Sequence, residues 1–113
     1  MILVLGGIAS GKRTYVASLG YDESQMSDSI ASSAPVLCGL QDMLREGPLS
    51  EEELEALQRK EVVVCCEVGQ GVVPLDPSDR AWRELVGRTC ARLARHARVV
   101  RMVCGIPVTI KEA

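Results

Sequence analysis

The sequence predicts an α/β fold with a small, mainly parallel sheet. Apolar segments at 1–5 and 62–66 have the length and aliphatic composition of strands that are buried on both faces of a parallel sheet. Segments with helical spacing alternate with them, and another apolar segment, VVRMV, follows the longest of these. Such alternation is typical of right-handed crossovers within one domain. With 113 residues the chain has room for a single domain with one core, which we place at 1–113.

A glycine-rich loop follows the first predicted strand. Gly6, four further residues, Gly11 and Lys12 have the spacing of a P-loop, and Lys12 lies where a helix is predicted to begin. In such a loop the backbone N–H groups and the helix N-terminus surround a phosphate, and the lysine adds a positive charge. We therefore expect a P-loop NTPase-like, three-layer fold whose loop binds the phosphates of a nucleotide. The expected binding residues are Gly6, Gly7, Ser10, Gly11, Lys12, Arg13 and Thr14.

The loop departs from the P-loop pattern at one position. The motif normally ends in Ser or Thr, whose hydroxyl binds the magnesium of the nucleotide, and Arg13 occupies that place. Thr14 does not replace it, because one residue further along a helix points about 100° away. Arg13 either contacts phosphate through its guanidinium or lies at the surface. Phosphate binding is thus better supported than catalysis, and the alternative is a glycine turn that merely joins a strand to a helix.

The segments between the two long strands are predicted to be helical or irregular. The first helix extends from the glycine loop to Leu19, and 21–34, which is dense in Ser, Asp and Glu, is predicted as a loop that can cover the phosphate site. For 35–48 we favour a short strand or turn followed by a helix. Ser50 and Glu53 form a capping-box pattern, which predicts a short helix that ends at about Lys60.

The longest predicted helix lies in the last third of the chain. It begins at about Asp76 or Ser78 and has a single apolar face, formed by Trp82, Leu85, Val86, Thr89, Leu93 and Ala97. The strand VVRMVCG follows it, and VTIK is predicted as a last strand at the edge of the sheet.

Glu67 directly follows the second long strand. Because the carboxyl ends of parallel strands meet at one edge of a sheet, we expect Glu67, Gly69 and Gly71 to face the same cleft as the glycine loop. Lys12 and Glu67 are the candidate catalytic residues, with Glu67 as a ligand of Mg²⁺ or as a base; alternatively, Glu67 pairs with an arginine or is solvated. Arg80 and Arg83 are candidates for contacting substrate or a second phosphate across this cleft.

Charge is distributed unevenly along the chain. Residues 1–79 carry 13 acidic and 5 basic side chains, net −8, and residues 80–113 carry 2 acidic and 8 basic ones, net +6. The basic part suits an anionic ligand or an acidic surface of the same or a neighbouring subunit, whereas nucleic acid is not expected of an acidic chain with few aromatic residues. No apolar segment reaches the roughly 20 residues of a membrane span, so we expect no membrane partner and a cytoplasmic location.

The cysteines and the single histidine offer little sign of further chemistry. Cys38, Cys65, Cys66, Cys90 and Cys104 have no C-x-x-C spacing, and we expect them to be buried free thiols rather than a zinc site or disulfides. His96 is expected to be a solvated residue at the end of the longest helix rather than a catalyst.

Three stretches in order, GGIASGK, EVGQGVVP and RAWRELVGRTCARLA with VCGIPVTIK, resemble the adenosylcobinamide kinase/adenosylcobinamide-phosphate guanylyltransferase family. The resemblance implies a P-loop enzyme of cobalamin biosynthesis that phosphorylates adenosylcobinamide with ATP or GTP and then transfers GMP to that phosphate. It also implies a homo-oligomer, a trimer in the family. The matching positions are the glycine-loop residues, the EVG-x-G segment with Glu67, Gly69 and Gly71, and Arg80, Arg83 and Gly87 of the helix that follows.

Several departures from the family pattern fall on the chemistry. The segment 20–50 is shorter and lacks the R-I-x-x-H stretch whose histidine takes up GMP, and the D-C-L-T segment corresponds to 37–40 without its aspartate. Cys66 replaces the asparagine of N-E-V-G. We therefore expect the guanylyltransferase step to be lost and the kinase step to be the one retained. The alternative is a catalytically degenerate relative that binds a nucleotide or another subunit.

Overall fold

A single mixed sheet organises the chain. The computed structural model describes residues 1–68 and 76–113. In this part of the chain the sheet has six strands in the order β2-β3-β4-β1-β5-β6, and every neighbouring pair is parallel except β5 and β6. The strands are β1 Ile2–Gly6, β2 Met26–Ser27, β3 Val36–Leu37, β4 Val62–Cys66, β5 Arg98–Val103 and β6 Ile106–Lys111.

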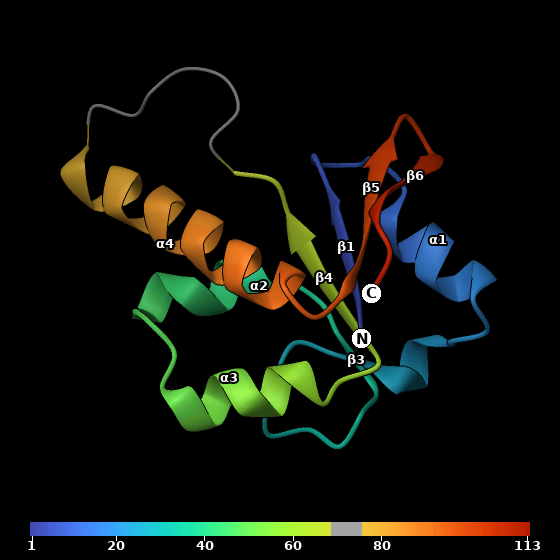
Figure 1. Ribbon diagram of the computed structural model, residues 1–113, viewed down its shortest axis with the longest axis horizontal. Coiled ribbons are helices and arrows are strands. Elements are labelled where there is room, and N and C mark those ends of the chain that lie inside the picture. Colours follow the sequence, from blue (N-terminus) through green and yellow to red (C-terminus); the bar gives the residue numbers. More distant parts are fainter. Residues whose placement is uncertain (69–75) are drawn as a thin grey trace.

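Helices cover both faces of this sheet, as Figure 1 shows. They are α1 Lys12–Ser18, α2 Leu40–Met43, α3 Glu51–Gln58 and α4 Pro77–Ala94, with 3-10 turns at Glu23–Gln25 and Leu44–Glu46. Helix α1 packs on one face and the other three on the opposite face (Figure 1). The predicted α/β, P-loop NTPase-like three-layer fold is confirmed.

The central strands divide their side chains between two cores. In β4, Val62 and Val64 pack with Val16 of α1, whereas Val63 and Cys65 pack with residues of α2, α3 and α4 such as Leu40, Leu57 and Val86. Successive side chains of a strand point to opposite faces, so this division follows directly from the period of two. This alternation determines on which side of the sheet each strand side chain lies.

The helix boundaries follow the capping signals in the sequence. Ser50 accepts a hydrogen bond from the Glu53 N–H, and the Glu53 carboxylate accepts one from the Ser50 N–H, so the predicted capping box is confirmed. Asp76 caps α4 by accepting from the Ser78 N–H, with Pro77 at the first helical position. Of the helices in the described part of the chain, none combines the length and apolar character that crossing a membrane requires.

Two predictions near the sheet edges needed correction. The segment 21–34 was predicted as a loop, but it contains the 3-10 turn and the strand β2, which pairs with β3 through Met26 and Ser27. The last strand begins at Ile106 and includes Pro107, so it is longer than VTIK. Proline is tolerated there because β6 is an edge strand with one neighbour.

Candidate functional site

The glycine loop leaves β1 at the carboxyl edge of the sheet and enters α1 through a left-handed residue. Gly11 precedes the helix with φ 92°, a conformation that costs glycine little and other residues more. Ala9 also has a positive φ, 57°. These turns carry the chain from strand to helix within a few residues and leave the first N–H groups of α1 without side-chain caps.

Lys12 folds back over the loop from which it starts. Its Nζ donates to the carbonyl oxygens of Gly6 at 3.1 Å and Gly7 at 2.6 Å. An ammonium has three N–H donors, so one remains for a further acceptor. The contacts fix a positive charge at the turn between strand and helix.

Contacts on the other side of the loop tie it to the β5–β6 hairpin. The Gly105 N–H donates to the Ser10 carbonyl at 3.0 Å. The Ser10 hydroxyl is buried, and its oxygen has no hydrogen-bond partner among the described residues. It lies over Gly6, where an added Cβ would come within 2.4 Å of the Ser10 Oγ. The loop is therefore packed as well as hydrogen-bonded.

A cavity of about 560 Å³ opens beside this loop. This volume is within the range of small-molecule sites, which is about 300–1,000 Å³. Residues 8–14 form one wall, and the opposite wall comes from residues in or next to β2, β3, α2 and β4: Asp28, Cys38, Gly39, Gln41, Asp42, Val64 and Cys66. The structure thus brings Ser10, Gly11, Lys12, Arg13 and Thr14 to one cavity, with Gly6 and Gly7 beneath Lys12.

Gln41 holds the wall that faces the loop. Its side-chain oxygen accepts a hydrogen bond from the Cys66 N–H at 2.9 Å, and its backbone oxygen accepts one from the Trp82 indole at 2.8 Å. Arg45 lies 3.5 Å from the centroid of the Trp82 ring and pairs with Asp79 at 2.6 Å. These contacts join α2, the end of β4 and α4, so the position of the cavity wall depends on all three.

Two carboxylates, Asp28 and Asp42, line the cavity, and neither was expected from the sequence. Asp42 is near the start of α2, where its carboxylate accepts from the Gln41 side-chain amide at 3.5 Å. Asp28 follows β2 directly. Neither residue belongs to a recognisable motif. The only available signal was that polar residues after short strands at the carboxyl edge of a parallel sheet tend to face one crevice.

Arg13 lines the cavity but also has a partner outside it. Its guanidinium lies 3.5 Å from the carboxylate of Glu23, and both side chains are largely exposed. Cys38 lines the same cavity from the opposite wall. Burial raises the pKa of Cys38, and the positive charge of Arg13 partly offsets this effect. Cys38 is therefore a protonated thiol at neutral pH.

Glu67 lies at the end of β4, next to the start of the glycine loop, but its side chain turns to the other face. The Glu67 N–H donates to the Gly6 carbonyl at 2.8 Å. The carboxylate is paired in bidentate fashion with Arg101 of β5, at 2.8 and 3.1 Å. It lines a separate cavity of about 400 Å³ on the α4 side of the sheet, together with Gly87 and Cys90.

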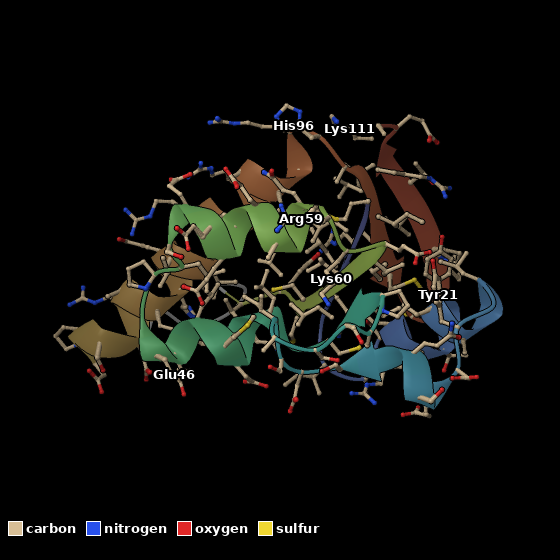
Figure 2. All side chains as sticks on the ribbon, turned by 90° about the horizontal axis from the view of Figure 1, so that it is seen from below. Tyr21, Glu46, Arg59, Lys60, His96 and Lys111 are labelled. Carbon is tan, nitrogen blue, oxygen red and sulfur yellow. The ribbon has the colours of Figure 1, made fainter. Side chains whose placement is uncertain are left out.

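The remaining predicted site residues lie away from the glycine loop. Arg80 is exposed and Arg83 half-buried on α4, and neither is among the described residues that line the cavity beside the loop. Gly69 and Gly71 fall outside the described residues. His96 is exposed and projects at the outer edge of the molecule beyond the end of α4, next to Lys111 (Figure 2).

The cysteines are free thiols, as predicted, but they are not all buried. Cys38 and Cys65 are buried, Cys66 and Cys90 are half-buried, and Cys104 is exposed. Cys104 occupies a positive-φ position in the turn between β5 and β6, which points it to solvent. Among the described residues no group of three or more His, Cys, Asp or Glu side chains is placed to hold a metal ion.

The fold and the site define an α/β protein of the three-layer type with a strand-to-helix glycine loop at a ligand-sized cavity. A model of the cobinamide kinase / cobinamide phosphate guanyltransferase family matches residues 40–110. The chain therefore belongs to this family, whose members are transferases of cobalamin biosynthesis. No curated protein matches the chain closely enough to count as a relative. The matched segment begins after the glycine loop, so the role of the loop depends on its own geometry.

Proposed function

We propose that the chain is a nucleotide-binding, cobinamide-kinase-like enzyme that phosphorylates adenosylcobinamide with ATP or GTP. The observation that carries the proposal is the position of Lys12. Its ammonium is held by two carbonyls at the edge of the 560 Å³ cavity, at the N-terminus of α1. Phosphoryl transfer depends mainly on positioning and on neutralising phosphate charge, and a fixed lysine beside a helix N-terminus supplies both.

The guanylyltransferase step of the family is not part of this proposal. The chain has one histidine, His96. It does not line the cavity beside the glycine loop, and it projects from the far end of α4 (Figure 2). The resemblance assigns the covalent GMP step to a histidine in a segment that this chain lacks. Both observations support a protein with the kinase step alone.

We propose Mg²⁺ as the cation that accompanies the nucleotide, since carboxylates are the protein ligands it prefers and it neutralises phosphate charge when bound. From the sequence, Glu67 was expected to fill this role. The geometry supports Asp42, with Asp28 as a second candidate, because both line the cavity with Lys12. Glu67 is occupied by Arg101 on the opposite face of the sheet. Substitutions of Glu67 and of Asp42 are therefore expected to affect Mg²⁺-dependent nucleotide binding differently.

Calorimetric titration with ATP and with GTP, each with and without Mg²⁺, tests the nucleotide site. We expect Lys12→Ala to weaken binding by about tenfold or more, which corresponds to about 1.4 kcal/mol. Asp42→Asn is expected to remove the strengthening by Mg²⁺, whereas Glu67→Gln keeps it. If Glu67→Gln removed the strengthening by Mg²⁺ and Asp42→Asn kept it, Glu67 would be the metal ligand instead.

Lys60→Ala is a matched control for Lys12→Ala. Its Nζ also donates to two backbone carbonyls, those of Ser32 at 2.6 Å and Ala34 at 2.7 Å. Lys60, which Figure 2 labels, is not among the residues that line the cavity. Removing it breaks the same kind of contact away from the site. Nucleotide binding that is weakened equally by both substitutions would contradict the proposed role of Lys12.

A homo-oligomer is the second part of the proposal, and exposed apolar side chains support it. Val103, Ile106, Val108 and Ile110 are between 44% and 63% exposed. The pairing register Arg101↔Val108 and Val103↔Ile106 places them on one face of the β5–β6 hairpin. Such stripes are typical of subunit contacts. The same exposed side chains support equally well the alternative of a catalytically degenerate family member that binds another subunit. A solution molar mass equal to one 12.2 kDa chain would contradict self-association.

A further inference from the structure

The Gln41 side chain has a fixed orientation at the edge of the cavity beside the glycine loop. Its Oε1 accepts a hydrogen bond from the Cys66 N–H at 2.9 Å. A backbone N–H only donates, so the amide oxygen faces Cys66 and the NH₂ group faces away from it. The main chain is held as well, because the Gln41 carbonyl oxygen accepts from the Trp82 indole at 2.8 Å. Gln41 is half-buried and lines the 560 Å³ cavity, so its NH₂ group is the end that a ligand meets.

The Gln41 NH₂ group has a donor to spare. It carries two N–H groups. Its one hydrogen-bond partner in the described part of the chain is the Asp42 carboxylate, and the distance from Nε2 to Oδ2 is 3.5 Å, which is long for a hydrogen bond. At least one N–H therefore remains for an acceptor in the cavity. A phosphate oxygen is such an acceptor, and an uncharged amide binds it without a proton of its own to lose.

Backbone contacts bring this donor to the same point of the sheet edge as Lys12. Strands β1 and β4 are parallel neighbours in which Gly6 pairs with Cys66, and neighbouring strands lie about 4.8 Å apart. The Glu67 N–H donates to the Gly6 carbonyl at 2.8 Å, and the Lys12 ammonium donates to the same oxygen at 3.1 Å. Gln41 is held by Cys66, the residue before Glu67. Lys12 and Gln41 are thus anchored at the carboxyl ends of two adjacent strands.

We propose that the Gln41 amide binds the terminal phosphoryl group of a nucleoside triphosphate and thereby makes the site select triphosphates over diphosphates. This inference rests on the proposed nucleotide-binding function and specifies the substrate class of the same cavity. The lysine of a glycine loop reaches the outer phosphates, and Gln41 contacts them from the wall opposite residues 8–14. Donors on two sides fix the terminal phosphoryl group in position, which is the main requirement of phosphoryl transfer.

Gln41→Glu separates the two ends of the side chain. A glutamate keeps an oxygen that accepts from the Cys66 N–H, but its ionised carboxylate has no N–H to offer a phosphate. The folded chain is titrated calorimetrically with the β,γ-imido analogue of ATP and with ADP, and then with the corresponding guanine nucleotides. We expect Gln41→Glu to weaken binding of the triphosphate analogue by about tenfold or more, the usual effect of losing a hydrogen bond to a charged group, and of the diphosphate much less. The melting temperature is expected to stay close to that of the parent chain.

Gln25→Glu is the control for the added negative charge. The Gln25 side-chain oxygen also accepts from a backbone N–H, that of Asp22 at 3.0 Å, and Gln25 is not among the described residues that line the cavity. This variant is expected to bind both nucleotides as the parent chain does. Gln41→Met adds no charge and is expected to show the same selective loss for the triphosphate, with a lower melting temperature because the Cys66 N–H loses its acceptor.

Failure of this inference is distinguishable from failure of the proposed function. If the parent chain binds nucleotide and both Gln41 variants bind the triphosphate analogue as tightly, the inference is overturned and the proposed function stands. Equal weakening of triphosphate and diphosphate would overturn it too, since Gln41 would then act only by holding the cavity wall. A loss that disappears when EDTA replaces Mg²⁺ would assign the effect to a metal held by Asp42. A parent chain that binds no nucleotide would overturn the proposed function and this inference together.

Discussion

Gly6 leaves the space that the Ser10 hydroxyl occupies. A Cβ at Gly6 would lie 2.4 Å from the Ser10 Oγ and 3.1 Å from both the Cβ and the carbonyl oxygen of Met102. The side chain cannot move away easily because Ser10 is buried and its backbone oxygen accepts from Gly105. The first glycine of the loop is thus required by packing, independently of any ligand.

Gly6→Ala is predicted to lower the free energy of unfolding by about 1–3 kcal/mol, the usual cost of overpacking. Gly7→Ala is the matched control, since a Cβ there meets no atom within 4 Å. It is expected to stay within about 0.5 kcal/mol of the parent chain. Chemical denaturation measures both, and an equal loss of stability in the two variants would show that the Ser10 contact does not constrain the loop.

Some residues of the candidate site could be predicted from the sequence, and others could not. The glycine loop and Lys12 were predicted from spacing, and the structure brings Ser10 to Thr14 to one cavity. Glu67 was expected to face the cleft of the glycine loop, and this was wrong. Val62 to Cys65 are all buried, and an apolar run without polar alternation does not show which face each residue takes. Gln41 carries no motif, and its importance arises only from contacts with Cys66 and Trp82, which are distant in sequence.

At the scale of elements, local signals predicted most of the secondary structure. The capping box at Ser50, the aliphatic run of β4 and the single apolar face of α4 each gave the correct element. Strand β2 was missed because two residues, Met26 and Ser27, are too few to show a period. It forms through pairing with β3, a tertiary contact that a local pattern does not contain.

An ion pair joins the two longer helices of the α4 side. Arg92 of α4 contacts both carboxylate oxygens of Glu51 in the first turn of α3, at 2.8 and 2.5 Å. The hydrogen bonds from Arg92 hold the pKa of Glu51 below its ordinary value of 4.5. A lowered carboxyl pKa stabilises the folded state at pH values above that ordinary value, and the stabilisation is lost as the pH falls through the lowered pKa.

Glu51→Gln is therefore predicted to lower the melting temperature at neutral pH and to match the parent chain in acid. The effect is expected to be small and weakened by salt, because both side chains are substantially exposed. Glu52→Gln removes a carboxylate from the same turn, and no ion pair of Glu52 occurs among the described residues. Thermal unfolding of the parent chain and both variants from neutral to acid pH tests this prediction. If the lower melting temperature of Glu51→Gln persisted unchanged in acid, the ion pair would be excluded as its cause.

At the scale of the whole molecule, the fold separates two sites by the thickness of the sheet. The α1 face carries the glycine loop and the 560 Å³ cavity, and the α4 face carries the 400 Å³ cavity with Cys90 and the Glu67–Arg101 pair. The carboxyl end of β4 reaches both sides: Val64 and Cys66 line the first cavity, and Cys66 and the following Glu67 line the second. The Glu67 carboxylate lies on the face opposite the glycine loop, where it is paired with Arg101.

We propose above all that this member of the cobinamide kinase / cobinamide phosphate guanyltransferase family retains the kinase step. The most direct measurement incubates the chain with adenosylcobinamide and γ-labelled ATP or GTP in the presence of Mg²⁺ and follows label in the corrinoid product. We predict labelled adenosylcobinamide phosphate that is lost in Lys12→Ala, retained in Lys60→Ala, and not converted further when GTP is in excess. Nucleotide binding without any labelled corrinoid would contradict the kinase assignment and favour the degenerate, subunit-interaction alternative.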